Sequence, residues 1–204
     1  NVDAIYFNEK LYIGKREEVF VYNESTGNFD LYYHLAGKDI TLSCLHLDEK
    51  KNLWMGTTSN GIYCLSEDKS LSRPVTKGNI TSIYEDSSNE LWIGSWEEGL
   101  YRVKTDGNIE NLRHNPMNTN SLCSNFVRSC CEDNSGDLWI GTFNGLNRYD
   151  RETGKFHLYT ANGNSPDGLT HSSIWCIVKD GQGTIWLGTY FGGVNYFNPE
   201  YEIY

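Results

Sequence analysis

Four aspartates at matching positions are the first residues whose type and spacing could do chemistry. Paired carboxylates act as general acid and base in glycoside hydrolysis, so a hydrolytic centre is one interpretation. Each Asp, however, ends an apolar run and precedes a turn rich in Ser, Asn or Gly, where an Asp side chain commonly caps the turn. A catalytic set would also differ between copies, so we expect these carboxylates to be structural. They are Asp48, Asp86, Asp133 and Asp180.

Other catalytic or metal-binding patterns are not visible in the sequence. The turns after the aspartates lack the alternating Asp pattern of a calcium loop, and the cysteines include no Cys-x-x-Cys pair. The histidines are scattered along the chain, at His34, His46, His114, His157 and His171. We therefore expect no catalytic residue, no metal and no cofactor, and a carbohydrate-active lyase or hydrolase is the least favoured interpretation.

The six cysteines leave two readings open. An even number would suit disulfides in a secreted protein, but Cys130 and Cys131 are adjacent, and four of the six lie in apolar, strand-like runs. This spacing favours buried free thiols that pack as small apolar side chains.

The aspartates belong to a repeated unit. Each lies five residues before a tetrapeptide of the type Leu-Trp-Ile-Gly, and a Gly followed by an apolar and then an aromatic residue comes shortly after it. The copies recur at intervals of about 40 residues, a spacing typical of repeat proteins. They begin at Leu53, Leu91, Leu138 and Ile185, with a weaker copy at Leu11.

Each unit is predicted to form four short antiparallel strands. The tetrapeptide does not alternate between apolar and polar residues, which indicates a sheet covered on both faces, as in a β-propeller blade. We therefore predict an all-β propeller with five blade repeats, closed by itself or part of a larger ring. The expected blades are 1–37, 38–76, 77–114, 115–160 and 161–204, and together they make one propeller domain or a fragment of one, 1–204.

The expected inner strands lie near 40–47, 79–85, 125–132 and 173–179, and the expected fourth strands include Phe29–Tyr32, Phe156–Tyr159 and Tyr201–Tyr204. The repeated Trp54, Trp92, Trp139 and Trp186 are expected to be buried between blades.

From Asp133 to Asp150 the chain resembles the two-component regulator propeller repeat almost position for position. The likeness is weak in the first unit, where Tyr12 replaces Trp. The resemblance implies the periplasmic part of a membrane-anchored hybrid two-component histidine kinase of Bacteroides-type bacteria, which detects glycan fragments and regulates polysaccharide use. It also implies further propeller and β-sandwich domains as partners, a homodimer when intact, and no catalysis by this fragment. A propeller that serves only as a scaffold or dimerisation module is the alternative.

Five residues break the repeat where loops and inner strands would converge on one end of a propeller. Trp96, Phe143 and Tyr190 lie in loops between second and third strands. Arg128 and Trp175 both lie five residues before the repeated Asp, where other units carry Ser or Thr. Aromatic walls with a few hydrogen-bonding groups suit sugar recognition, so these five are the candidate oligosaccharide site. Packing between blades is the alternative role for them.

Composition narrows the ligand class. The formal net charge is −10, which argues against nucleic acid as a partner and favours a neutral or basic oligosaccharide over a heavily sulfated one. Charged residues make up 22% and aromatic residues 14% of the chain, which argues against disorder.

Overall fold

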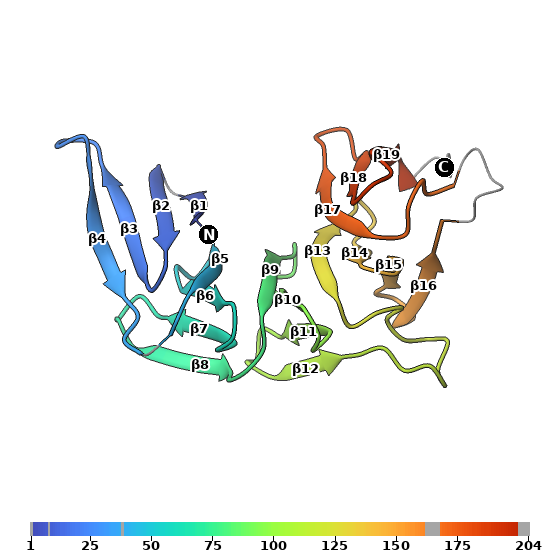
Figure 1. Cartoon of the computed structure of the whole chain (residues 1–204), viewed down its shortest axis with the longest axis horizontal. Helices are drawn as coiled ribbons and strands as arrows, with labels where there is room; N and C mark the ends of the chain where they lie inside the picture. Colours follow the sequence, from blue (N-terminus) through green and yellow to red (C-terminus); the bar gives the residue numbers. More distant parts are fainter. Residues whose placement is uncertain (1, 8, 38, 162–167, 200–204) are drawn as a thin grey trace. The chain divides into compact units, whose positions relative to one another are not determined.

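The computed structural model describes residues 2–7, 9–37, 39–161 and 168–199, and these ranges contain β-strands and no α-helix (Figure 1). The first sheet consists of β1 (Val2–Phe7), β2 (Lys10–Lys15), β3 (Glu18–Asn23) and β4 (Asn28–His34). The second consists of β5 (Leu42–Leu47), β6 (Leu53–Thr57), β7 (Ile62–Leu65) and β8 (Leu71–Val75). The third consists of β9 (Ile80–Glu85), β10 (Leu91–Ser95), β11 (Leu100–Val103) and β12 (Ile109–Leu112). The fourth consists of β13 (Val127–Glu132), β14 (Leu138–Thr142), β15 (Gly145–Asp150) and β16 (Lys155–Tyr159). The fifth contains β17 (Ile174–Lys179), β18 (Ile185–Thr189) and β19 (Val194–Phe197).

Strands that follow one another in the sequence are neighbours in each sheet, as in a meander. The predicted all-β fold with four-stranded antiparallel blades is confirmed, and β5, β9, β13 and β17 begin and end close to the predicted inner strands. Val2–Phe7, Phe29–Tyr32 and Phe156–Tyr159 lie in strands as expected. The remaining fourth strand, predicted at Tyr201–Tyr204, lies outside the described residues.

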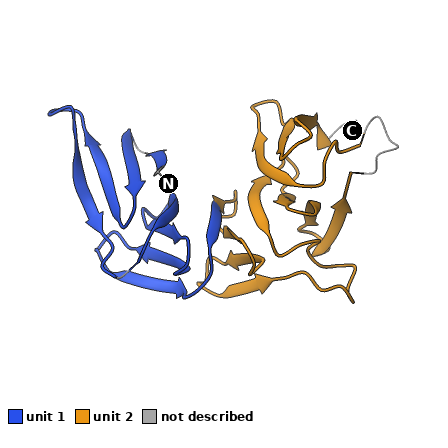
Figure 2. Ribbon diagram, in the orientation of Figure 1, with its two compact units in different colours: residues 1–83 blue, residues 84–204 orange. Residues whose placement is uncertain are grey.

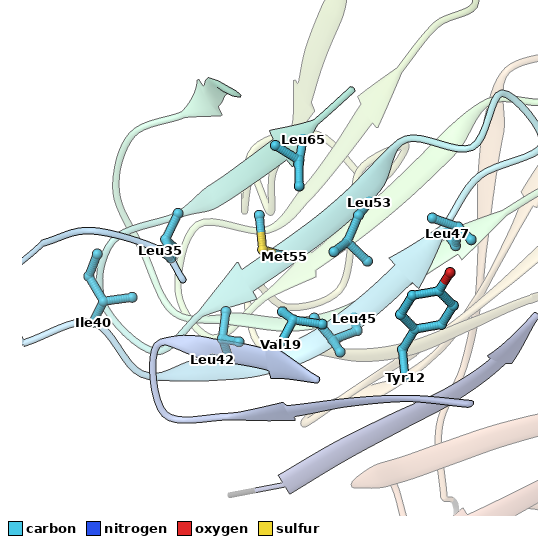
Figure 3. Packing of buried hydrophobic residues seen from close by; sticks show 10 residues of the cluster. All are labelled: Tyr12, Val19, Leu35, Ile40, Leu42, Leu45, Leu47, Leu53, Met55 and Leu65. Atoms are coloured by element: carbon cyan, nitrogen blue, oxygen red, sulfur yellow. The ribbon is translucent and has the colours of Figure 1, made fainter. Parts of the chain in front are cut away.

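The chain divides into two compact units, residues 1–83 and 84–204 (Figure 2). In the first unit, the first and second sheets share a buried core. Side chains such as Tyr12 of β2, Leu45 of β5 and Met55 of β6 point toward one another there (Figure 3). The Tyr12 ring also meets the Tyr32 ring edge-on, with 5.2 Å between centroids. Apolar side chains on facing sheets thus hold this unit together, as expected for stacked blades.

The repeated Trp is a member of two buried cores of the second unit. Trp92 of β10 is 0% exposed and its ring centroid is 5.6 Å from that of Tyr149 in the fourth sheet. Trp139 of β14 is 1% exposed and its centroid is 4.7 Å from that of Phe197 in the fifth sheet. Each Trp is therefore covered by an aromatic residue of the following sheet.

Trp186 of β18 departs from the expectation of burial. Its side chain is 41% exposed, whereas Trp54, like Trp92 and Trp139, is buried. Trp186 lies on the face of the fifth sheet that points away from the fourth, and the described residues provide no further sheet to cover that face. Burial of this Trp therefore depends on a neighbour and not on the tetrapeptide itself.

The Gly of the tetrapeptide makes room for the next sheet. A Cβ on Gly141 would lie 2.7 Å from Ile174 Cγ2, and one on Gly14 would lie 3.0 Å from Leu45 Cδ1. Both contacts are with the inner strand of the following blade, so Gly lets two sheets approach closely. The blades stack mainly because burying apolar side chains between adjacent sheets lowers the free energy.

All six cysteines have free thiols. Four are buried, which agrees with the expected role as small apolar side chains, and burial raises the pKa of the Cys44 thiol to about 12 and that of Cys64 to about 11. Cys123 is only partly buried, and Cys176 is exposed, on the same uncovered face of the fifth sheet as Trp186. Strand position alone therefore does not decide the burial of a thiol here.

Candidate ligand-binding site

The hairpin loops that carry the three candidate aromatic residues are held by a repeated hydroxyl group. Thr142 Oγ1 donates a hydrogen bond to the Gly145 carbonyl at 2.8 Å and accepts one from the Asn144 amide at 3.2 Å. Ser95 and Thr189 make the equivalent pairs of bonds in their own blades. Because each hydroxyl bridges both sides of its loop, it fixes the loop that carries Trp96, Phe143 or Tyr190.

The two candidate residues on inner strands both occupy β-bulges. The pairing of β13 with β14 shifts register between Val127 and Ser129, so Arg128 is the extra residue. The pairing of β17 with β18 shifts at the equivalent place, so Trp175 is the extra residue there. A bulge changes the direction of a side chain and is common beside binding sites.

These loops and bulges bring the five predicted residues together in the second unit. The Arg128 guanidinium carbon lies 3.7 Å from the Trp175 ring centroid and 5.1 Å from that of Trp96. The Trp175 and Tyr190 rings are 5.6 Å apart at an interplanar angle of 30°. Phe143 joins through one further residue, Phe126, which we did not predict. We call this set the aromatic–arginine surface: Trp96, Phe126, Arg128, Phe143, Trp175 and Tyr190.

Phe126 links the two loops on its sides. Its ring centroid is 5.4 Å from that of Trp96 and 6.3 Å from that of Phe143. It lies just before β13, at a position that no repeated motif marks. The only signal in the sequence was therefore an aromatic residue shortly before an inner strand. Phe191 was also missed as a site residue, although its ring is 4.4 Å from the Tyr190 ring and 6.2 Å from the His171 ring.

Half of this surface faces solvent. Phe143 is 50% exposed, Trp175 is 47% exposed and Tyr190 is 53% exposed, whereas the other three members are partly buried. Phe143 keeps this exposure although its own blade is covered by the fifth sheet at Trp139. Two of these exposed rings lie on fixed loops and the third on a bulge, and together they present apolar faces to solvent.

The arginine in this surface carries an unbalanced charge. Burial lowers the pKa of Arg128, and no carboxylate in the described ranges opposes this effect. Its Nε is buried and has no hydrogen-bond partner in the described part of the chain. The surface thus combines stacking faces with a cation that no carboxylate of the described residues pairs with.

The four aspartates serve a different purpose. Asp86 Oδ1 accepts hydrogen bonds from the amides of Ser88 at 2.8 Å and Glu90 at 3.0 Å, and Oδ2 accepts one from the Trp92 indole at 2.6 Å. The predicted turn-capping role is therefore confirmed, and the bond to the indole is a second role that the sequence reading missed. The same indole bond recurs from Trp54 to Asp48, from Trp139 to Asp133 and from Trp186 to Asp180.

Asp86 has an additional partner across the interface between the third and fourth sheets. Arg151 Nη2 lies 2.6 Å from Asp86 Oδ2 and 3.2 Å from Glu132 Oε1, and all three side chains are largely buried. Burial alone would raise the pKa of Asp86, but the bonds from Trp92, Glu90 and Arg151 outweigh it and leave the pKa below its ordinary value. A carboxylate held ionised in this way is suited to a structural role and not to proton donation.

Among the described residues, no group of three His, Cys, Asp or Glu side chains is arranged to hold a metal ion. In the same ranges, no helix is long and apolar enough to span a membrane.

Three segments of the chain, residues 74–97, 121–144 and 168–191, match the family model described as two component regulator propeller. These three segments are similar to repeats of that family. Each matched segment includes an inner strand, the Asp turn, the Trp strand and the start of the following loop, as the resemblance in the sequence implied. All five predicted site residues lie within the matched segments.

Solved structures share the fold. The extracellular domain described as part of a hybrid two component system of B. thetaiotaomicron superposes with a TM-score of 0.77 at 21% identity, over 95% of this chain and 26% of that one. Virginiamycin B lyase of Staphylococcus aureus gives a TM-score of 0.70 at 16% identity, over 96% of this chain and 69% of the lyase. PorZ, a surface component of the type-IX secretion system of Porphyromonas gingivalis, gives 0.71 at 13% identity, over 97% of this chain and 32% of that one. This chain thus spans about a quarter of the first of these proteins, and no curated protein sequence matches it.

Proposed function

We propose that this chain is a non-catalytic, ligand-binding part of the periplasmic sensor of a hybrid two-component system, and that it binds an oligosaccharide fragment. The observation that carries the proposal is the aromatic–arginine surface, in which five residues that break the repeat lie together and partly exposed. Sugar recognition needs this mixture of flat apolar faces and a few hydrogen-bond donors.

The family match supports the signalling context, because the segments similar to two-component regulator propeller repeats include all three loop residues and both bulges of the surface. In such a sensor the ligand acts by stabilising one arrangement of the neighbouring domains or protomers over another, which requires a difference in affinity between the two arrangements. Further propeller and sandwich domains, a homodimeric assembly and control of polysaccharide use belong to this proposal.

Absence of catalysis is supported by the state of the repeated carboxylates. Each accepts an indole hydrogen bond, and turn amides occupy a second oxygen, so these groups are committed to the fold. A lowered pKa, as in Asp86 and Asp180, is also the opposite of what a general acid at neutral pH requires.

The test is calorimetric titration of the chain with a panel of di- to hexasaccharide fragments, followed by analysis of each mixture for cleavage products. We expect at least one fragment to bind with roughly micromolar affinity, because a shallow, hydrated surface buries little area. No fragment should be cleaved. Binding of none of them would favour the scaffold or dimerisation role, and turnover would establish an enzyme.

A further inference from the structure

Arg128 differs from the other arginines of the second unit because it has no carboxylate partner among the described residues. The contrast is sharp, since the remaining four all form ion pairs. Arg102 pairs with Glu90 at 2.6 Å, Arg113 with Glu98, Arg148 with Asp137 at 3.6 Å, and Arg151 with Asp86 at 2.6 Å.

The surroundings of Arg128 make the missing partner costly. Its guanidinium lies against the rings of Trp175 and Trp96, and its Nε is buried without a hydrogen bond. Aromatic faces attract a cation, but they leave its N–H donors unused. Buried Nε atoms also occur in Arg148 and Arg151, yet both of those side chains have a carboxylate beside them. A partly desolvated charge without a counter-charge is unfavourable unless something supplies one.

We propose that Arg128 binds the carboxylate of a uronic acid unit, within an oligosaccharide whose rings stack on Trp175 and Tyr190. This inference rests on the proposed function and specifies its ligand. The planar guanidinium presents paired N–H donors that match the two oxygens of a carboxylate. Trp175 lies against the guanidinium, and Tyr190 lies beside Trp175. Both rings are about half exposed, so an acidic sugar could stack and pair at the same time.

The local charge at this surface differs from that of the whole chain. A net charge of −10 alone favours a neutral or basic ligand. Arg128, however, is the only charged member of the aromatic–arginine surface, and short-range pairing at a partly buried site is screened less than the long-range field. One cation suits one anionic group, which favours a single uronate over a polysulfated chain.

The test compares matched ligands and matched variants of the chain by calorimetry. The ligands are uronate-containing di- to tetrasaccharides, each beside its carboxyl-reduced neutral form and a monosulfated neutral counterpart. The variants are Arg128→Gln, Arg128→Lys and the control Lys155→Gln. Lys155 is exposed at the end of the β15–β16 hairpin, opposite the Phe143 loop, and its substitution removes the same charge. Near-ultraviolet circular dichroism checks that each variant keeps its packing.

We expect a uronate member to bind the wild-type chain at least tenfold more tightly than its neutral form. Arg128→Gln should weaken uronate binding by about 10- to 100-fold, which corresponds to losing hydrogen bonds between charged groups, and should weaken binding of the neutral form by a smaller factor. Arg128→Lys keeps the charge but loses the paired donors. Its affinity for the uronate should therefore lie between that of the wild type and that of Arg128→Gln. Lys155→Gln should bind as the wild type does.

Several results would overturn the inference. Equal binding of uronate and neutral forms, or uronate binding that survives Arg128→Gln, would remove Arg128 from recognition while leaving oligosaccharide binding intact. Binding of monosulfated sugars but not of uronates would show that the surface recognises a sulfate group and not a carboxylate. If Arg128→Gln disturbs the packing, Arg128→Lys provides the test instead. An unchanged affinity of Arg128→Lys for the uronate would contradict a carboxylate held by two N–H donors of the guanidinium. Binding of no member, neutral or acidic, would overturn the proposed function as well.

Discussion

The guanidinium carbon of Arg128 lies 3.7 Å from the ring centroid of Trp175, although the two residues belong to inner strands of different blades. Both occupy the extra position of a β-bulge. The two strands, which belong to different sheets, are joined by the packing of the buried Ile177 and by a hydrogen bond from its amide to Ser129 Oγ at 3.1 Å. Equivalent positions of successive repeats are thus brought into contact, and because they carry different residues the resulting surface is asymmetric.

The exposed rings of this surface should dominate ligand affinity. Trp175→Ala and Tyr190→Ala are each expected to weaken oligosaccharide binding by about tenfold or more, because exposed aromatic anchors commonly carry most of the binding energy. Trp186→Ala is the matched control, since Trp186 is similarly exposed at 41% but its indole is bonded to Asp180 and lies outside the surface. Calorimetry with the fragment panel measures all three. Unchanged binding in the first two variants would place the site elsewhere.

The buried Trp of the fourth blade should be a major contributor to stability. Trp139→Ala is expected to lower the free energy of unfolding by about 3–5 kcal/mol, because it empties a large volume beside Phe197 and Tyr159. Trp186→Ala, at the same repeat position, should cost well below that amount because its ring is 41% exposed. Urea unfolding of both variants provides the comparison. Equal losses would mean that the covering sheet is unimportant.

Close approach of neighbouring blades should make Gly141 intolerant of even a methyl group. Gly141→Ala places a Cβ 2.7 Å from Ile174 Cγ2, and we expect it to destabilise the chain by about 1–3 kcal/mol through overpacking. Gly181→Ala is the control, because nothing lies within 4 Å of its added Cβ and its φ is not positive. A thermal or urea melt that ranks the two variants alike would contradict the packing described here.

Acid should weaken the contact between the third and fourth blades. The pKa of Asp86 is lowered in the folded state, so its ionised form contributes stability that is present above the unfolded pKa and is lost as pH falls through the folded value. Asp86→Asn removes this contribution. The gap in unfolding free energy between wild type and Asp86→Asn should therefore be largest near neutral pH and should narrow in acid below about pH 4. Urea titrations at several pH values measure it, and a gap that is constant with pH would be the contrary result.

The sequence was sufficient for the fold because the same signals recur in the second to fifth units, with a weaker copy in the first. The unalternated apolar tetrapeptide, the Asp turn and the inner-strand run together predicted strand positions and blade type. Trp186 shows the limit of this reasoning, since its tetrapeptide matches that of Trp139 but its burial differs from it. Burial is decided by what packs on the sheet, and that information is not local to the repeat.

Departures from the repeat identified the five predicted members of the aromatic–arginine surface. Their mutual contacts could not be derived, because they depend on bulges that turn Arg128 and Trp175 and on packing between blades. Phe126 was missed because no repeated position marks it. The indole bond to Asp was also missed, although the constant spacing between Asp and Trp could have indicated it.

The indole N–H signals of the six tryptophans give the most direct test of the binding surface. We propose ¹⁵N-labelled indole NMR during titration with an oligosaccharide that binds, with signals assigned by single Trp→Phe variants. The account predicts that Trp96 and Trp175 shift, while Trp54, Trp92 and Trp139, whose indoles are buried and bonded to Asp, stay in place. Shifts at Trp186 with none at Trp96 or Trp175 would place the ligand on the uncovered face of the fifth blade and contradict the account.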